Sequence, residues 1–157
     1  MVKLFSSADL LEMAIHIEEE GEKFYKMLED KAEKEDLKRF FSFLAIEEKK
    51  HAITFKEIYK EIEKEGFISA YPDEEANKYL HAFVDSQVFI NWDDMMKRSY
   101  FNIEEVLNIA INLEKDSILF YYELERFIPE KDKKILHEII KQEKNHLLQL
   151  TEFKKSL

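Results

Sequence analysis

Apolar side chains recur along this chain with the spacing of a helix. Positions i, i+3, i+4 and i+7 are apolar over four long segments, each long enough to cross a helical bundle. Their approximate ranges are 7–30, 34–65, 103–127 and 131–155. Short links at 31–34 and 128–130 join the first segment to the second and the third to the fourth. Such links are typical of antiparallel neighbours, so the pattern predicts two helical hairpins.

A different stretch separates the two hairpins. Residues 66–101 are rich in aromatic side chains, and Pro72 could begin a shorter helix that runs to about Phe89. We interpret this stretch as a long crossover connection. Periodicity leaves open whether its apolar side chains pack over the bundle or face another subunit. The side chains concerned are Ala76, Tyr79, Leu80, Phe83 and Val84.

Composition agrees with a helical protein. Among 157 residues there are only 2 Gly and 2 Pro, the residues that punctuate turns, while 37% are charged and 45% hydrophobic. A chain of this length is sufficient for one domain with a real core. We therefore expect an all-α fold, a four-helix bundle with a crossover between the second and third helices, formed by a single domain over residues 1–157.

Charge and cysteine content exclude several functions. The formal net charge of −10 opposes binding to phosphate backbones, so we expect no nucleic-acid partner. No stretch approaches the roughly 18–20 apolar residues of a membrane span, and the N-terminus lacks the apolar core of a signal peptide. We expect no membrane association and a cytoplasmic location. With 0 Cys, any metal ion must be bound by oxygen and imidazole ligands.

The motif Glu-x-x-His occurs twice, at Glu48/His51 and Glu143/His146. In a chain so rich in Glu the motif alone has a high false-positive risk. An internal duplication gives it weight, because residues 5–25 align without gaps on residues 101–121 at an offset of 96, and the two Glu-x-x-His motifs match at an offset of 95. The identical pairs are Phe5/Phe101, Leu11/Leu107, Ala14/Ala110, Ile15/Ile111, Glu18/Glu114, Phe24/Phe120 and Tyr25/Tyr121.

Helical geometry places the acidic and imidazole side chains of both halves inside. At about 100° per residue, Glu18 lies on the apolar face of its helix, Glu114 repeats this position, and both Glu-x-x-His motifs share a face with apolar residues. Four buried carboxylates without compensation would be very unfavourable, and two divalent cations would neutralise them. The predicted metal ligands are Glu18, Glu48, His51, Glu114, Glu143 and His146.

Three further residues belong to this prediction. Gly21 lies in mid-helix, where glycine costs about 1 kcal/mol relative to alanine, so we expect a steric reason for it. Tyr25 and Tyr121 follow Glu18 and Glu114 by seven residues. A core aromatic with a satisfied hydroxyl is favoured over a redox role, and either hydroxyl could donate to a carboxylate that binds metal.

As an ordered set, these motifs resemble the rubrerythrin-like branch of the ferritin-like di-iron carboxylate family. The resemblance covers the four helices and not the crossover. It implies a ferritin-like bundle with two iron ions, manganese or zinc being the alternatives. By analogy, Glu48 and Glu143 would bridge the two ions. The matching motifs are Ala14-Ile15-x-Ile17-Glu18-x-x-Gly21-x-x-Phe24-Tyr25, Glu48-x-x-His51, Ala110-Ile111-x-Leu113-Glu114-x-x-Ser117-x-x-Phe120-Tyr121 and Glu143-x-x-His146.

The same analogy assigns the terminal ligands: Glu18 and His51 to one ion, Glu114 and His146 to the other. Two departures stand beside it. Rubrerythrins proper carry a rubredoxin domain with paired Cys-x-x-Cys motifs, which this chain lacks, so electrons would come from a separate donor such as a rubredoxin-type protein. Ser117 stands where they have a further Glu, which makes the ligand set more symmetric, nearer to that of bacterioferritin.

Several functions are compatible with these features. The leading hypothesis is a di-iron oxidoreductase that reduces hydrogen peroxide or dioxygen. The alternatives are a ferroxidase or iron-handling protein, and a non-catalytic helical interaction module that uses the aromatic crossover; substrate hydroxylation also stays open. The aromatic residues of 67–101 further suggest a homodimer without locating its interface.

Overall fold

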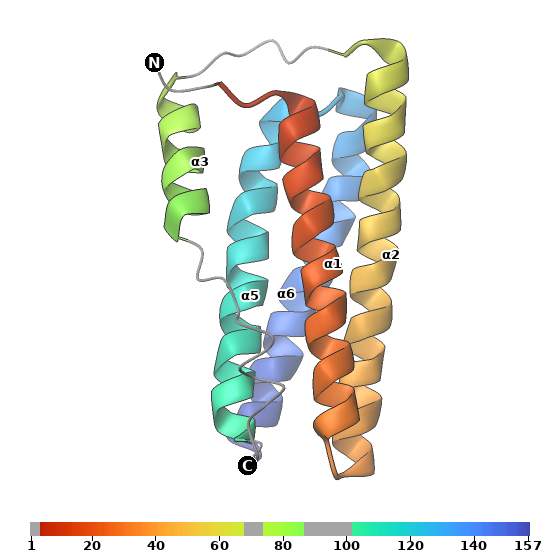
Figure 1. Ribbon diagram of the computed structural model, residues 1–157, viewed down its shortest axis with the longest axis vertical. Helices are drawn as coiled ribbons and strands as arrows, with labels where there is room; N and C mark the ends of the chain where they lie inside the picture. Colours follow the sequence, from red (N-terminus) through yellow and green to blue (C-terminus); the bar gives the residue numbers. More distant parts are fainter. Residues whose placement is uncertain (1–3, 68–73, 87–101) are drawn as a thin grey trace.

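A computed structural model of the chain describes residues 4–67, 74–86 and 102–157. Within these ranges it has helices and no strands, which confirms the predicted all-α fold. Four long helices run side by side as two antiparallel hairpins, and a fifth, shorter helix lies outside them (Figure 1). The helices are α1 (Ser7–Lys31), α2 (Glu35–Glu65), α3 (Glu74–Ser86), α5 (Ile103–Leu124) and α6 (Lys133–Lys155).

Local sequence explains where the helices begin and end. Ser6 and Asp9 form a capping box before α1: the Asp9 amide donates to Ser6 Oγ at 3.0 Å, and the Ser6 amide donates to the Asp9 carboxylate at 2.9 Å. At the corresponding place before α5, the Asn102 side chain accepts from an amide one turn into the helix. Gly66 ends α2 with φ 65°, a left-handed conformation that glycine adopts without strain.

The link between α5 and α6 is longer than the sequence predicted, because both α-helices stop short of it and 3₁₀ turns take their place. The third helix was expected to run to 127, but the α-helix ends at Leu124 and continues as a 3₁₀ turn, Glu125–Phe127. Ile128 is extended, as the residue before a proline usually is, and Pro129 precedes a second 3₁₀ turn, Glu130–Asp132. The two turns reverse the chain and let α6 return along α5.

Helix α3 covers part of the bundle from the side of α5 (Figure 1). Ala76, Leu80 and Phe83 are buried, and the Phe83 ring stacks on Phe120 of α5 with 5.6 Å between centroids. Packing over the bundle is therefore confirmed for these three side chains, whereas Tyr79 is 43% exposed. The predicted start at Pro72, the side chain of Val84 and the stretch beyond 86 lie outside the described residues.

The chain that precedes α1 holds α3 in place. The Phe5 amide donates to Asn77 Oδ1 at 2.9 Å, and the Phe5 ring stacks on His81 at 4.3 Å. Helix α2 ends and helix α5 begins at opposite ends of the bundle (Figure 1). None of the helices in the described ranges is both long and apolar enough to cross a membrane.

Two apolar clusters fill the two ends of the bundle. One contains Leu10, Leu11 and Ala14 of α1, and the other contains Phe24 and Leu28 of the same helix. Between these positions α1 places Glu18, so the carboxylate lies in the middle layer of the bundle with apolar packing on both sides. That layer holds the candidate site.

Candidate metal centre

All six predicted ligands meet in the middle layer. Helices α1 and α5 each supply one Glu, and α2 and α6 each supply a Glu and a His one helical turn apart. None of the six residues is more than 5% exposed, so these are charged groups placed inside a protein core. They are Glu18, Glu48, His51, Glu114, Glu143 and His146.

Their ligand atoms fall into two overlapping groups. In each group the candidate atoms all lie within 4.8 Å of one another. One group is Glu18, Glu48, His51 and Glu143; the other is Glu48, Glu114, Glu143 and His146. Glu48 and Glu143 belong to both groups. One Glu and one His of its own complete each group. This division has the form expected for two adjacent metal ions that share two carboxylates.

Five buried polar atoms of this layer could each bind a further partner. Glu18 Oε2, Glu48 Oε1 and Glu114 Oε2 are buried and have no hydrogen-bond partner among the described residues, whereas His51 Nδ1 and Glu143 Oε1, also buried, face each other at 2.7 Å. A buried polar atom without a partner costs about 1–3 kcal/mol, and more when it is charged. The five atoms come from four carboxylates and one imidazole, the donor set that suits divalent iron, manganese or zinc. The residues present therefore fit a pair of metal ions.

Both imidazoles turn the same ring nitrogen toward the carboxylates. His51 Nδ1 lies 2.7 Å from Glu143 Oε1 and 3.5 Å from Glu18 Oε2. His146 Nδ1 lies 3.2 Å from Glu143 Oε2 and 3.5 Å from Glu48 Oε1. The two rings stack with 5.9 Å between their centroids. Each ring is thus oriented to bind metal through Nδ1.

The carboxyls of Glu18 and Glu114 hold protons unusually strongly. Burial raises the pKa of both well above the usual range, because it disfavours the charged form. The neighbouring carboxylates of Glu48 and Glu143 raise the pKa of each further. Without a cation, the cluster therefore reduces its negative charge by protonation.

The imidazoles respond to the same negative field. Burial alone would lower the pKa of His51 and of His146, but the nearby carboxylates outweigh it and raise both, that of His146 to about 12. Burial would likewise raise the pKa of Glu143, but its contacts with the two imidazoles outweigh burial and lower it well below the usual range. Protons thus supply the positive charge that metal ions would otherwise bring.

The two predicted tyrosines connect the hairpins crosswise. Tyr25 of α1 donates its hydroxyl to Glu114 Oε1 of α5 at 2.5 Å, and Tyr121 of α5 donates to Glu18 Oε1 of α1. Each of these carboxylates therefore has one oxygen held by a tyrosine, while its other oxygen has no hydrogen-bond partner among the described residues and belongs to one of the two candidate ligand groups. The expected hydrogen bonds to ligand carboxylates are present in the structure.

Gly21 has the steric role that its mid-helix position suggested. A Cβ atom placed there would lie 3.3 Å from Glu48 Oε2 and 3.4 Å from Glu48 Cγ and Cδ. Contacts this short would require the Glu48 side chain to move. Glycine at this position lets α1 approach a carboxylate that both ligand groups share.

Sequence reasoning missed two residues beside the histidines. Gln142 occupies the position that corresponds to Glu47 in the repeat, and its Oε1 lies 2.6 Å from His51 Nε2. Phe43 of α2 meets the His146 ring edge-on, with 6.1 Å between centroids. The signal for Gln142 was available, since it directly precedes a ligand on a helix that faces α2. Phe43 carries no such signal.

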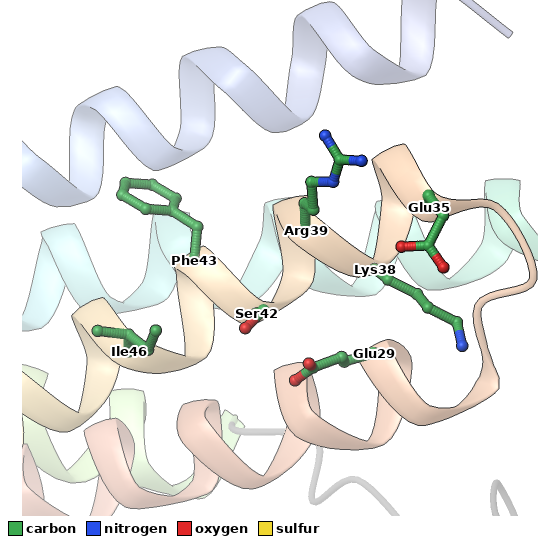
Figure 2. Close-up of a pocket in the computed structure, with 7 residues that line it drawn as sticks. All are labelled: Glu29, Glu35, Lys38, Arg39, Ser42, Phe43 and Ile46. Atoms are coloured by element: carbon green, nitrogen blue, oxygen red, sulfur yellow. The ribbon is translucent and has the colours of Figure 1, made fainter.

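Phe43 also borders a surface groove of 440 Å³ between α2 and the end of α1 (Figure 2). Its side chain is 42% exposed, so one ring separates this groove from His146. Phe43 and Arg39 lie on the side of α2 that faces α6 (Figure 2). The groove contains none of the six candidate ligands; its lining residues are Glu29, Glu35, Lys38, Arg39, Ser42, Phe43 and Ile46.

Comparison with known proteins agrees with this geometry. The sequence matches the family model for rubrerythrin over residues 9–154, which includes all six candidate ligands. The chain belongs to the rubrerythrin family. A solved structure from Thermotoga maritima, assigned to the ferritin-like diiron-carboxylate proteins, is similar to this rubrerythrin-family chain with 32% identity and a TM-score of 0.76. The match covers 97% of this chain and 96% of that one.

A second solved structure, a hypothetical protein from Pyrococcus furiosus, has 23% identity and a TM-score of 0.68, over 96% of this chain and 89% of that one. At this identity the likeness concerns the fold alone. No curated protein matches the sequence. Rubrerythrin-family membership and the buried Glu/His cluster both support a di-metal site in a ferritin-like bundle.

Proposed function

We propose that the protein is a di-iron oxidoreductase that reduces hydrogen peroxide or dioxygen to water. One observation carries the proposal: two ligand groups share Glu48 and Glu143 and differ by one Glu and one His each. This arrangement supports two metal ions held close enough to act on one small oxidant. The proposal assigns all six residues as ligands, with Glu48 and Glu143 shared between the ions.

The charges of the site agree with two divalent ions. Four carboxylates carry four negative charges, which two divalent cations balance in a core that excludes bulk solvent. Carboxylate and imidazole ligands suit iron and manganese, although zinc competes by affinity. When bound, two ferrous ions would supply the two electrons that reduce one peroxide to two waters; dioxygen needs four electrons to reach water, so two more would have to come from the separate donor.

The protein's own part is to hold the ligands and to limit access. Tyr25 and Tyr121 keep the terminal carboxylates in place through one oxygen each. Burial and the facing carboxylate raise the pKa of both tyrosines well above the ordinary value, so their hydroxyls stay protonated as donors. With 0 Cys in the chain, we propose that electrons return to the site from a separate donor protein of the rubredoxin type.

Rapid mixing of the anaerobic ferrous protein with hydrogen peroxide tests this function. We expect the ferric absorption of the protein to appear far faster than the oxidation of an equal concentration of free Fe(II), with one peroxide consumed for two irons. Redox-inert zinc loading is the control for non-specific peroxide loss. Oxidation no faster than that of free Fe(II) would remove the proposal.

A second candidate, iron oxidation for storage or transfer, is favoured by Ser117. This residue occupies the position where a further ligand Glu would make the two halves of the site unequal. Its hydroxyl donates to the Leu113 carbonyl oxygen at 2.9 Å and not to a candidate metal ligand. Repeated additions of Fe(II) in air separate the two functions. Continued uptake of iron well beyond two per chain would support iron handling, whereas a fixed content of two would support the oxidoreductase.

A further inference from the structure

The duplicated bundle is not symmetric around its two histidines. His51 Nε2, the ring nitrogen that faces away from the carboxylates, lies 2.6 Å from Gln142 Oε1. The repeat counterpart of Gln142 is Glu47, and its carboxylate instead pairs with Lys50 at 2.9 Å on the outer face of α2. His146 instead makes a T-shaped ring contact with Phe43, with 86° between the ring planes. One imidazole is therefore held by a hydrogen bond from the opposite hairpin, and the other by a ring contact.

We propose that Gln142 is a positioning residue that fixes His51 with Nδ1 aimed at the metal, and that the position formed by Glu18 and His51 fills first. This inference rests on the proposed di-metal site and adds an order of filling to it. Nothing in the two ligand groups themselves predicts an order, since each has the same residue types.

The chemistry of the amide sets the tautomer. Gln142 Oε1 has no proton and can only accept, so the short contact requires a proton on His51 Nε2. A neutral imidazole with its proton on Nε2 has its lone pair on Nδ1, the atom that faces the Glu143 and Glu18 carboxylates. The hydrogen bond therefore leaves the ligand atom available and fixes the plane of the ring. Partners of this kind typically change metal affinity about 10–100-fold when they are removed.

The location of Gln142 also suits this role. It is only partly buried and lies next to Glu143 on α6, while His51 belongs to α2. The hydrogen bond thus joins two helices of different hairpins at the site, and it keeps His51 in the binding geometry before any metal arrives. His146 lacks such a bond to Glu47, so part of its positioning has to accompany metal binding.

Anaerobic titration with Co²⁺, followed by calorimetry and visible absorption, tests the proposal. In the unaltered protein we expect two resolved steps of one equivalent each. Gln142→Leu should weaken the first step about 10–100-fold and leave the second unchanged. The matched variant Glu47→Leu, at the repeat position, should change neither step. Gln142→Glu should restore the first step, because a carboxylate oxygen accepts the same proton.

A direct reading of the tautomer guards against a variant that does not fold. Nitrogen-15 NMR of the zinc-loaded, unaltered protein should show His51 with its proton on Nε2 and Nδ1 bound to metal. The opposite tautomer would overturn the inference. The inference would also be overturned if Gln142→Leu bound Co²⁺ as the unaltered protein does, or if Glu47→Leu weakened the first step as much as Gln142→Leu. Two binding steps that cannot be told apart in the unaltered protein would overturn it as well.

The outcomes separate this inference from the proposed function. Two bound Co²⁺ with no effect of Gln142→Leu overturn the inference alone. Ordered filling that depends on Gln142, combined with slow oxidation by peroxide, supports the inference and removes the reductase. No Co²⁺ bound by the unaltered protein would overturn the di-metal site and the inference with it.

Discussion

Two tyrosines determine how the terminal carboxylates of this site are held. Tyr25 and Tyr121 each reach across to the other hairpin and donate to one oxygen of Glu114 or Glu18. The remaining oxygen of each carboxylate is buried and has no hydrogen-bond partner in the part of the chain that the structure describes. A hydroxyl in this position both satisfies a buried oxygen and restricts its carboxylate to one orientation, so it affects stability and metal binding together.

Replacing Tyr25 by Phe should therefore destabilise the metal-free protein by about 1–3 kcal/mol, because Glu114 Oε1 loses its donor in a buried site. Urea unfolding followed by circular dichroism measures this change. Tyr59→Phe is the matched control: that hydroxyl donates to Glu12 and Glu63 at the surface, and its loss should stay within about 0.5 kcal/mol. Equal effects of the two substitutions would contradict the role given to Tyr25.

The lack of a side chain at Gly21 matters more for the position of Glu48 than for the stability of α1. Gly21→Ala should favour the helix by up to about 1 kcal/mol, yet its Cβ would press on Glu48 at 3.3–3.4 Å. We expect metal affinity to fall about tenfold while the metal-free protein stays folded. Competition with a chelator measures the affinity. Ser117→Ala, at the repeat position, should leave the affinity unchanged; a fall in both variants would argue against the steric explanation.

At the scale of the elements, periodicity alone located the four long helices and the ligand faces. Helical geometry fixes which side of its own helix a residue occupies, so Glu18 and Glu114 could be assigned to the interior from sequence. The order of residues does not fix how one hairpin is placed against the other. The crosswise partners of Tyr25 and Tyr121 and the contact of Gln142 with His51 depend on that placement, and only the structure reveals them.

Helix boundaries, too, could be predicted from the sequence only in part. Ser and Asn are residue types that cap helices, and the side chains of Ser6 and Asn102 each accept from a backbone amide in the first turn of their helix. The end of α5 differs because the third segment passes from α-helix to a 3₁₀ turn before Pro129, and both forms bury residues at similar spacing. For α3, the sequence left two partners open, and the burial of Leu80 and Phe83 decides for the bundle.

The docking of α3 leads to a prediction about cooperativity. Leu80 is fully buried, and α3 is joined to α5 through Phe83 and to the start of the chain through Asn77. Leu80→Ala should lower the free energy of unfolding of the whole protein by about 2–5 kcal/mol. Equilibrium unfolding in urea tests this, with the exposed Tyr79→Ala as control. An unchanged main transition would mean that α3 unfolds separately from the bundle.

At the scale of the whole molecule, a polar layer lies between two apolar clusters, and its charge state links stability to pH. For Glu18 and Glu114 the folded pKa is raised, so the stability they provide is complete below their unfolded value of 4.5 and is lost as the pH rises through the folded pKa. The pKa values of His51 and His146 are also raised, so the stability that these residues provide is lost as the pH rises above 6.5. The pKa of Glu143 is lowered, so its contribution to stability is present above pH 4.5 and is lost only at more acidic pH.

Above about pH 5, therefore, Glu18 and Glu114 destabilise the metal-free fold as the pH increases, above 6.5 His51 and His146 do so as well, and Glu143 contributes a constant amount. Bound divalent metal replaces those protons, and its affinity increases with pH because fewer protons have to leave. The difference in Tm between metal-loaded and metal-free protein should thus widen steadily from pH 5 to pH 8. Thermal unfolding at matched pH and ionic strength, with zinc as a redox-inert ion, measures this difference.

The double variant Glu18→Gln/Glu114→Gln provides the matched control. Its amides carry no proton to lose, so the metal-free form should lose much of its pH dependence over this range, while the loss of two ligands should remove most of the stabilisation by zinc. A difference in Tm that narrows as the pH rises in the unaltered protein would contradict the account. It would mean that the raised pKa values of the carboxyls do not govern metal binding, and that the four carboxylates are neutralised in another way.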